Sequence, residues 1–559
     1  MLVNILKSSY FRKNMILNWQ YSKKSFVIRT QFSIFFFFFL CLFIVLKMFF
    51  VSSYDNGKNK SCIGMNQHLR KEIVDRNNNS VCVNLTTFNL FIKSNQVDDI
   101  NYVARAICNS LKGLSYSKVL KKISSNKKFI YIKRNITFQE KEKIERYGIK
   151  SLGFEKSVKR FYPYGELLSH LVGYTNIDNV GLSGIEKGVI NDSILTDNSP
   201  VQLSIDLRLQ NIVYQEMELA KNKFNAQGAS AVVVDIDTGE VLSYVSLPNF
   251  DPNRIEQSNI NLDKNSFSLY ELGSIIKPLI MAIALDTNKT NLHNVYDITK
   301  LKVGRYDVKD VYDYQNKYYS VAQIMAKSSN KGIAKIGLQV GKEAIIDYMS
   351  KMQLFNKLNN LEINEKVKPI FPNLNKWNNL TVTTVCYGYS IAMSPMHYLQ
   401  SMIPVVNGGN LLPLTFIKTD KPKYVKKIFN EKTSNEINIL LRLAVTNGTS
   451  NRLDLKGLEI GGKTGSADKN ENGQYTRKDN IVASIFACFP MKKPKYAIFA
   501  MLDKPQGIKE SNFKAWGGVS TAPAVRNIIK KMASLYNIKK QKSDLYNQFK
   551  YLLYPKLDN

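Results

Sequence analysis

The sequence predicts an α+β protein in which an antiparallel sheet is flanked by helices. The main observation is the order of predicted elements after residue 200: a hairpin, several helices, three more strands and a closing helix. This order places the early hairpin and the late strands in one sheet, with helices packed on it. A second observation is an apolar stretch near the N-terminus. The length of 559 residues allows roughly two to four domains.

The apolar stretch predicts a single membrane helix. Residues 32–51 read FSIFFFFFLCLFIVLKMFFV, which is long enough to cross a bilayer core of about 30 Å. Residues 1–31 carry basic side chains and no acidic one, so the positive-inside rule keeps them in the cytoplasm. A cleaved signal peptide is disfavoured, because the basic leader is long and no A-x-A-like site follows. We expect an uncleaved anchor at residues 32–52, with the rest of the chain on the outer side of the membrane.

Residues 53–200 are polar and mixed, and we interpret them as a separate exported region. The run KFIYIKRNITF at residues 128–138 favours a strand, whereas no long periodic helix is evident. The cysteines include no C-x-x-C pair and the histidines are far apart, so spacing supports neither a metal site nor a Ser-His-Asp set. Cys62, Cys82 and Cys108 lie where a disulfide is chemically permitted, and isolated packed cysteines are the alternative.

Residues 201–538 contain the predicted sheet. Asp206 is placed to cap a helix whose apolar residues recur on one face up to Ala220. The segment GASAVVVDIDTGEVLSYVS then reads as a strand, a turn and a strand. Three further strand sequences, LEIGGKTGSA, NIVASIFACF and KYAIFAMLD, precede the helical sequence APAVRNIIKKMASLY. Residues 539–559 are charged and rich in tyrosine, and we interpret them as a peripheral tail.

The formal net charge of +33 raises the question of nucleic-acid binding. The basic residues are scattered among Asn, Ile, Tyr and Phe, without an Arg-rich run or a recognition motif. We therefore expect no nucleic-acid partner. A surface of this charge suits anionic lipid head groups or a carboxylate-rich polymer.

Three short motifs occur in a fixed order: Ser274-x-x-Lys277, Ser328-x-Asn330 and Lys463-Thr464-Gly465. This set is typical of penicillin-binding proteins and class A β-lactamases. Each motif is weak alone, since it also suits a helix cap, a turn or the end of a surface strand. The first pattern recurs at other serines, among them Ser115, Ser124, Ser125, Ser328 and Ser466. The order and the flanking sequence distinguish Ser274 from the others.

The residue types suit nucleophilic catalysis. Ser274 and Lys277 lie on the same face of the predicted helix, so the amine can reach the hydroxyl. A lysine acts as a base near neutral pH only if burial or a nearby positive charge lowers its pKa, and Lys463 and the helix N-terminus could supply that charge. The backbone N–H groups of Ser274 and of the Lys-Thr-Gly strand suit an oxyanion hole. Gly465 would let an extended peptide lie close along the strand edge.

The text around these motifs resembles class B penicillin-binding proteins, and the division-specific septal peptidoglycan transpeptidases among them. The resemblance starts at LRKEIVDRNNNSV from Leu69 and continues with RFYPYGELLSHLVGYTNIDNVGLSGIE from Arg160. It includes VVVDIDTGEVLSYVSLPNFDPN from Val232 and the landmarks YELGSIIKP, AKSSNKG, YGYSIAMSP and GGKTGSA. It implies an elongated pedestal domain at residues 53–200 and a β-lactamase-like transpeptidase domain at residues 201–538. The chain departs from the family pattern at Lys71, Asn78, Leu272, Ser390 and Ser466.

The resemblance implies a serine D,D-transpeptidase that β-lactams acylate. Ser274 would attack the D-Ala-D-Ala carbonyl of a peptidoglycan stem peptide, with Lys277 as the general base. Ser328 would relay the proton to the leaving amine, and Asn330 would position Lys277 and the substrate amide. The acyl group would then pass to an amine on a neighbouring stem, whose identity the sequence leaves open.

The third motif is implied in substrate binding. Lys463 and Thr464 would hold the terminal carboxylate of the substrate. The backbone N–H groups of Ser274 and Ser466 would stabilise the tetrahedral oxyanion. No cofactor and no metal is implied for this chemistry.

Several readings remain open at this stage. A serine β-lactamase would normally lack the anchor and pedestal. An elongation-type transpeptidase is the nearer alternative, although the segment around Thr175 and Asn176 favours division. A non-catalytic penicillin sensor or scaffold belongs to a different class. The resemblance also implies a polytopic glycosyltransferase and other division proteins as membrane partners, with this chain in the inner membrane at the division site.

Overall fold

The structure is a computed structural model that describes most of the chain. It describes residues 31–32, 34–48, 70–125, 127–192, 199–257, 260–311, 316–419, 421, 423–424, 426–471, 474–475, 480–541 and 545–554. The chain forms two compact units, Met1–Leu69 and Arg70–Asn559. All the predicted catalytic residues lie in the second unit.

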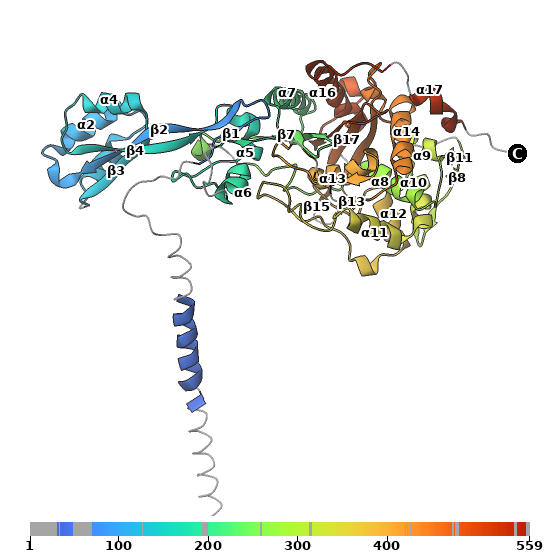
Figure 1. Cartoon of the computed structure of the whole chain (residues 1–559), viewed down its shortest axis with the longest axis horizontal. Coiled ribbons are helices and arrows are strands. Elements are labelled where there is room, and N and C mark those ends of the chain that lie inside the picture. Colours follow the sequence, from blue (N-terminus) through green and yellow to red (C-terminus); the bar gives the residue numbers. More distant parts are fainter. Residues whose placement is uncertain are drawn as a thin grey trace, which may run out of the picture. The chain divides into compact units, whose positions relative to one another are not determined.

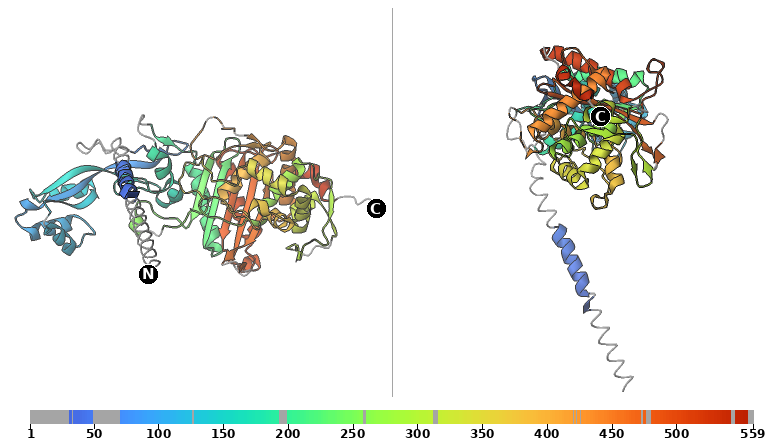
Figure 2. Two further views of the ribbon diagram at one scale, coloured as in Figure 1. Left: turned by 90° about the horizontal axis from the view of Figure 1, so that it is seen from below. Right: turned by 90° about the vertical axis from the view of Figure 1, so that its right-hand side faces the viewer.

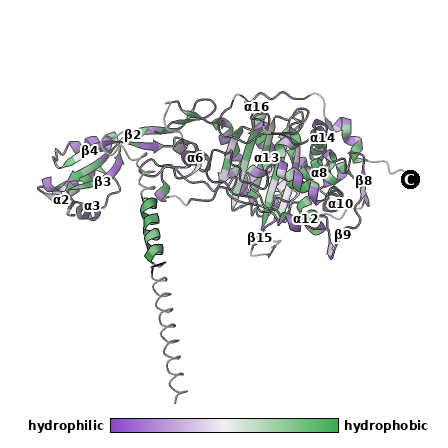
Figure 3. Cartoon of the chain, turned by 60° about the horizontal axis from the view of Figure 1, so that its bottom comes forward, coloured by the Kyte–Doolittle hydropathy of each residue, from purple (hydrophilic) through white to green (hydrophobic). Residues whose placement is uncertain are grey.

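The first unit contains a helix that includes residues 34–48 and is largely apolar (Figure 3). The predicted anchor at residues 32–52 continues past this helix into positions outside the described residues. Most of the predicted cytoplasmic segment and Cys62 also lie outside them. In the part of the chain that is described, no helix combines the length and the apolar character needed to cross a membrane. The predicted anchor is therefore not confirmed.

The long strand β2 organises the first part of the second unit (Figure 1). It pairs antiparallel with β1, β3 and β4, and β1 pairs in parallel with β5. Helices α2, α3 and α4 pack on one side around Leu90, Ile92 and Ile107. The predicted strand at residues 128–138 corresponds to β3, whereas α2 was not predicted. The elements are β1 (Ile73–Val74), β2 (Ser80–Lys93), α2 (Ile100–Ser110), α3 (Tyr116–Ile123), β3 (Phe129–Ile136), α4 (Phe138–Glu145), β4 (Leu152–Phe161), α5 (Ser169–Val172), α6 (Gly184–Asp192) and β5 (Val201–Gln202).

A buried ion cluster holds this region together where α6 meets the strands. The Glu186 carboxylate is fully buried and accepts hydrogen bonds from Nε of Arg70 at 2.8 Å and from Nε of Arg160 at 2.7 Å. The Cys82 thiol donates to the same carboxylate at 3.2 Å. The two arginines and the glutamate come from the separate segments that begin at Leu69 and Arg160. Cys82 and Cys108 are free thiols.

The second part of the unit is built on a five-stranded antiparallel sheet in the order β14-β17-β18-β6-β7. The early strand β6 pairs with the late strand β18 over their full length, so segments far apart in sequence lie side by side (Figure 2). The strands are β6 (Gly228–Asp235), β7 (Val241–Leu247), β14 (Gly461–Asp468), β17 (Ile481–Phe489) and β18 (Tyr496–Asp503). The predicted α+β class with an antiparallel sheet flanked by helices is confirmed.

Helices pack on both faces of this sheet, because side chains alternate along each strand. Val232 and Phe499 point into a core with α8, α13 and α14, while Val233 and Ile498 point into a core with α7 and α16. The helices are α7 (Leu207–Lys223), α8 (Lys277–Asp286), α9 (Val321–Lys327), α10 (Asn330–Val340), α11 (Lys342–Lys351), α12 (Asn379–Cys386), α13 (Pro395–Val406), α14 (Glu431–Asn447), α15 (Gly517–Ser520), α16 (Ala522–Leu535) and α17 (Leu545–Phe549). The Asp206 side chain caps α7 as predicted, accepting a hydrogen bond from the backbone N–H of Arg208.

Several two-stranded ribbons complete the second part. They lie in the connections between the larger elements, and the sequence analysis did not predict them. Their strands are β8 (Val295–Asp297), β9 (Lys302–Val303), β10 (Tyr306–Asp307), β11 (Tyr318–Ser320), β12 (Asn410–Leu411), β13 (Lys426–Lys427), β15 (Asn470–Glu471) and β16 (Gln474–Tyr475).

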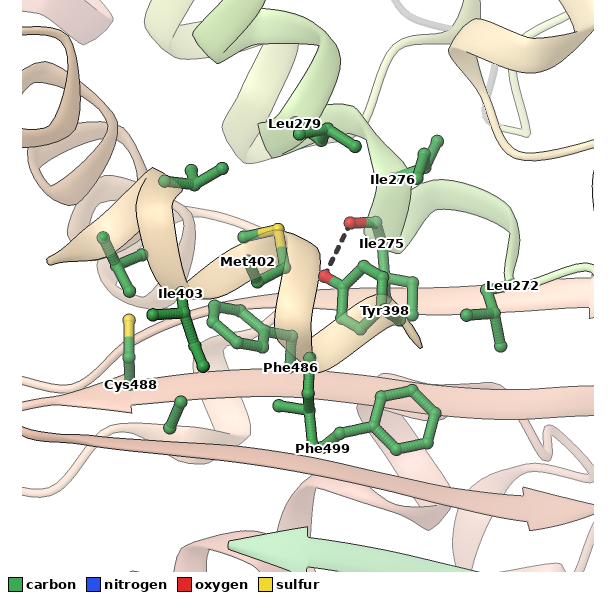
Figure 4. Packing of buried hydrophobic residues seen from close by; sticks show 14 of the residues in the cluster. Leu272, Ile275, Ile276, Leu279, Tyr398, Met402, Ile403, Phe486, Cys488 and Phe499 are labelled. Carbon is green, nitrogen blue, oxygen red and sulfur yellow. Dashed lines mark hydrogen bonds between the residues drawn. The ribbon is translucent and has the colours of Figure 1, made fainter. Parts of the chain in front are cut away.

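The core between the sheet and α8 extends to the start of that helix (Figure 4). Tyr398 of α13 packs against Phe486 and Phe499 of the sheet, with ring centroids 5.8 and 5.7 Å away. Its hydroxyl donates to the backbone carbonyl of Ile275 at 2.8 Å. The core therefore fixes the backbone next to Ser274.

The C-terminal residues differ from the peripheral tail predicted at 539–559. Leu552 and Leu553 are buried in the main core, and Tyr546 and Phe549 pack against it. The carbonyl of Leu552 also accepts a hydrogen bond from Ser320, the cap of α9, at 2.6 Å. The surrounding residues are mostly charged or polar. The overall composition of the segment therefore did not indicate that these four side chains are anchored.

Candidate active site

Ser274 lies in a tight turn that leads directly into α8. The turn is the 3₁₀ helix Gly273–Ile276, and Ser274 is half-buried within it. Gly273 has φ +58°, a left-handed conformation that a side chain disfavours. Its N–H donates to the carbonyl of Gly388 at 3.2 Å. Within the described residues, the Ser274 hydroxyl has no hydrogen-bond partner. The serine is thus held by its backbone while its hydroxyl stays free to react.

Lys277 begins α8 and is completely buried. Its amine donates to the carbonyl of Ser328 at 2.7 Å, to the hydroxyl of Ser328 at 3.1 Å and to Oδ1 of Asn330 at 2.7 Å. Burial lowers the pKa of Lys277 well below its ordinary value, and the nearby charge of Lys463 lowers it further. A neutral amine at this position can accept a proton, which is the property that a general base needs.

Lys463 of β14 is the second buried lysine of the site. Its amine donates to the Ser328 hydroxyl at 2.8 Å and to the carbonyl of Thr464 at 3.1 Å. Burial lowers the pKa of Lys463 to about 7. The two lysines thus approach the same hydroxyl of Ser328. The structure brings the three sequence motifs together at this one side chain.

Ser328 occupies the break between α9 and α10, where the sequence predicted a turn. It has φ +61°, in the left-handed region that non-glycine residues rarely adopt. This conformation ends α9 and starts α10 at Asn330, so that Ser328 and Asn330 can both reach Lys277. A strained backbone at a position with three converging polar groups is typical of a functional site.

Asp310 supports this turn, although the sequence analysis did not single it out. Its carboxylate accepts hydrogen bonds from the Ser329 hydroxyl at 3.0 Å and from the backbone N–H of Lys331 at 3.1 Å. It also accepts from the backbone N–H of Asn330. Asp310 comes from an irregular segment without a periodic pattern. No signal in the sequence other than its short distance along the chain from Ser329 could have indicated this contact.

The strand β14 carries the third motif at one edge of the described sheet. The Thr464 hydroxyl lies 2.8 Å from the hydroxyl of Thr449, which the sequence analysis did not single out. The Ser466 hydroxyl accepts a hydrogen bond from the backbone N–H of Gly517 at 3.1 Å. A Cβ on Gly465 would lie 2.6 Å from the carbonyl oxygen of Leu272. Glycine is therefore required for contact with the turn of Ser274, a reason different from the predicted peptide contact.

The family of the chain follows from comparison with known proteins. The family model "Penicillin binding protein transpeptidase domain" matches residues 229–530, and "Penicillin-binding Protein dimerisation domain" matches residues 67–191. The first match spans more than half of the chain and includes all three motifs. The chain belongs to the penicillin-binding protein transpeptidase family. The pair of matched domains makes it a class B penicillin-binding protein.

Curated relatives extend over most of the chain. A probable peptidoglycan D,D-transpeptidase FtsI from Caulobacter vibrioides is 28% identical over 490 residues, which are 84% of this chain and 82% of the relative. A probable peptidoglycan D,D-transpeptidase PenA from Neisseria gonorrhoeae is 29% identical over 433 residues, covering 72% of this chain and 73% of the relative. These relatives indicate a class B penicillin-binding protein of the FtsI type.

A solved structure shares the fold. The crystal structure of penicillin binding protein 2X from Streptococcus thermophilus superposes with a TM-score of 0.68 at 19% identity, covering 84% of this chain and 79% of that chain. At this level of identity the likeness bears on the fold alone.

The structure accommodates two departures from the family pattern near Ser274. Leu272, which stands in place of a proline, is 3% exposed and packs in the main core, so burial restrains this part of the turn. Ser390, which stands in place of a glycine, has φ +65°. Its backbone N–H donates to Glu271 at 2.8 Å, and its hydroxyl lies 2.9 Å from that of Thr384. These contacts offset the strain of the left-handed serine.

The other departures are harmless to the local fold or unexplained by it. Asn78 has φ +66°, and asparagine tolerates this conformation better than most residues. Lys71 is half-buried and its carbonyl accepts a hydrogen bond from Arg160 at 2.7 Å. Nothing in the structure explains the lysine side chain there.

In the described part of the chain, no group of three or more His, Cys, Asp or Glu side chains is arranged to hold a metal ion. The candidate site brings together a serine, two buried lysines with lowered pKa values and the Ser328 hydroxyl between them.

Proposed function

We propose that this chain is a peptidoglycan D,D-transpeptidase that cross-links stem peptides through an acyl-serine intermediate. The observation that carries the proposal is the position of Lys277, a buried amine with a lowered pKa, one helical turn from a serine with a free hydroxyl. The names of the FtsI and PenA relatives support the same activity.

In the proposed acylation step, Lys277 takes the proton of the Ser274 hydroxyl as the serine oxygen bonds to the penultimate D-Ala carbonyl carbon. The backbone N–H groups of Ser274 and Ser466 stabilise the oxyanion. Collapse of the tetrahedral intermediate breaks the peptide bond, and the terminal D-Ala leaves with a proton relayed through Ser328. The acceptor amine then attacks the acyl ester, loses a proton to the same relay and restores the serine.

Substrate binding in this proposal uses β14. Lys463 and Thr464 bind the terminal carboxylate, since a cationic amine and a hydroxyl both donate to an anion. The extended stem peptide lies along β14, in the manner of an added strand. Asn330 positions the substrate amide together with Lys277.

The cellular setting is also proposed. The apolar residues 32–52 would anchor the chain in the inner membrane with residues 1–31 in the cytoplasm and the catalytic region outside. The FtsI names favour a role in division over one in elongation. A polytopic glycosyltransferase is the expected partner that supplies glycan strands. Localisation of a fluorescent fusion to mid-cell or to the lateral wall distinguishes the two roles.

The activity is tested with a labelled penicillin on the full chain in detergent. Intact mass spectrometry should show one stoichiometric adduct that hydrolyses slowly, and Ser274→Ala should abolish it. Ser268→Ala is the matched control, because that hydroxyl donates to the backbone carbonyl of Asp263 at 3.0 Å and belongs to none of the three motifs. A D-Ala-D-Ala-type thioester should then transfer its acyl group to an added D-amino acid.

Each alternative predicts a different result. Rapid release of hydrolysed penicillin would identify a β-lactamase. A stable adduct without transfer to any amine would identify a sensor. An adduct that survives Ser274→Ala would refute the assigned nucleophile.

A further inference from the structure

Thr449 lies at the carboxylate-binding end of the site, outside the three motifs. It follows α14, and its hydroxyl is 2.8 Å from the Thr464 hydroxyl. Three segments hold it in place. Its N–H donates to the carbonyl of Ala326 in α9 at 3.1 Å, and a Cβ on Gly518 would lie 2.6 Å from its carbonyl oxygen. Thr449 therefore lies between α9, which leads to Ser328, and β14, which carries Thr464.

The preceding glycine shows that this approach is required by the packing. A Cβ on Gly448 would lie 2.2 Å from the carbonyl oxygen of Ala326. Only a residue without a side chain lets the chain pass this close to α9 and deliver Thr449 to Thr464. The same close packing limits the movement of the Thr449 hydroxyl relative to β14.

One hydrogen bond joins the two hydroxyls, and only one of them can be its donor. A threonine hydroxyl donates one hydrogen bond and accepts others, so either Thr449 or Thr464 is the donor of their contact. A bound carboxylate is a stronger acceptor than a neutral hydroxyl. When the Thr464 hydroxyl donates its hydrogen bond to a carboxylate, the bond between the two threonines persists only if Thr449 is its donor.

We propose that Thr449 is a positioning residue for recognition of the substrate carboxylate, donating to Thr464 and thereby directing the Thr464 proton to the anion. The proposal rests on the function proposed above and adds a specificity determinant to it. A hydrogen-bond chain of this kind also polarises its terminal donor, which strengthens the bond to the anion. The ligands concerned are acyl donors with a free carboxylate next to the reacting carbonyl group.

The test compares benzylpenicillin with its methyl ester, which lacks the anionic carboxylate. The second-order rate constant of acylation is measured on the full chain by intact mass. We expect Thr449→Val to slow acylation by benzylpenicillin about 3- to 10-fold, the range for one hydrogen bond between neutral groups. Acylation by the ester should change little. Thr449→Ser, which keeps the hydroxyl, should restore most of the preference for the acid.

Two further variants separate this role from a structural one. Thr446→Val is the matched control, because its hydroxyl bonds only to backbone carbonyls of α14, at 3.3 Å. It should alter neither rate. Combining Thr449→Val with Thr464→Val should add little to Thr464→Val alone, since Thr449 acts through Thr464.

The outcomes are decisive. Equal loss of acylation by the acid and the ester, failure of Thr449→Ser to restore the acid preference, or additive effects in the double variant would overturn the proposal. Absence of any adduct on the wild-type protein would instead refute the proposed function itself, so the two failures are distinguishable.

Discussion

Two buried charge clusters in this chain are built on opposite principles. In the predicted pedestal region, Glu186 is surrounded by two arginines whose side chains are 10% and 1% exposed. In the catalytic region, Lys277 and Lys463 are buried, have no ion-paired carboxylate among the described residues, and share the Ser328 hydroxyl. The first cluster pairs opposite charges, whereas the second places like charges together.

The pKa values follow this difference. Burial alone lowers the pKa of Arg160, but Glu186 reverses the effect and raises it above its ordinary value. Burial lowers the pKa of both lysines, and Lys463 lowers that of Lys277 further. A paired ion keeps its charge and stabilises the fold, while an unpaired buried amine becomes a base. The contrast separates a cluster of paired charges from the proposed catalytic cluster.

The largest effect expected from breaking this contrast is on catalysis. Lys277→Met removes the amine and keeps a long apolar side chain in the same core. Acylation by penicillin should fall about 10²- to 10⁴-fold, the usual contribution of a general base. The free energy of unfolding should change by no more than about 2 kcal/mol, because a poorly solvated amine is lost together with its hydrogen bonds. Stopped-flow or mass-based acylation and chemical denaturation measure the two quantities.

The matched control for this variant is Lys351→Met. That lysine forms a surface pair with Asp347 on α11, so its replacement should affect neither quantity. A large loss of stability in Lys277→Met with unchanged acylation would mean that the lysine is structural. The proposed difference in role between the two clusters would then be wrong.

The second effect is on stability. Glu186→Gln removes the anion that Arg70 and Arg160 both contact. The pedestal region should lose about 3–5 kcal/mol of stability, the range for breaking a buried ion pair. Thermal unfolding measures the loss, and acylation of the protein that remains folded should stay near the wild-type rate. Glu140→Gln is the control, since its pair with Lys133 at 3.2 Å is partly exposed and should be worth less than about 1 kcal/mol.

The lysine cluster was more accessible to prediction from sequence than the ion cluster. Its residues lie in short motifs whose spacing reflects local geometry, and Ser274 and Lys277 share one turn. The arginines and Glu186 lay inside the segments that carried the resemblance. No local sequence pattern showed that Arg70 meets Glu186, which lies 116 residues later. The same reason explains why Thr449 and Asp310 were missed. Both act on motif residues through contacts that only the tertiary fold creates.

The strands of the five-stranded sheet were predictable because they are short, almost continuously apolar runs. Helix α7 was predictable because its apolar residues follow a helical period and the cap at Asp206 marks where it begins. The burial of Leu552 and Leu553 was not predictable, because short apolar pairs in a charged segment carry no period.

The smallest expected effect is a difference between the two clusters in how their contribution to stability depends on pH. The pKa of Lys463 is lowered to about 7 in the folded protein, so between this value and the ordinary lysine pKa the unfolded chain binds more protons than the folded one. Stability relative to Lys463→Met should therefore rise with pH above 7, by at most about 1.4 kcal/mol per pH unit for one proton. Chemical denaturation of both proteins at pH 6.5, 7.5 and 8.5 measures this difference. Over the same interval the difference between wild type and Glu186→Gln should stay flat, because the arginine keeps its proton throughout. A rise that is equal for both variants would show that the pH dependence comes from elsewhere in this basic chain and not from the buried lysines.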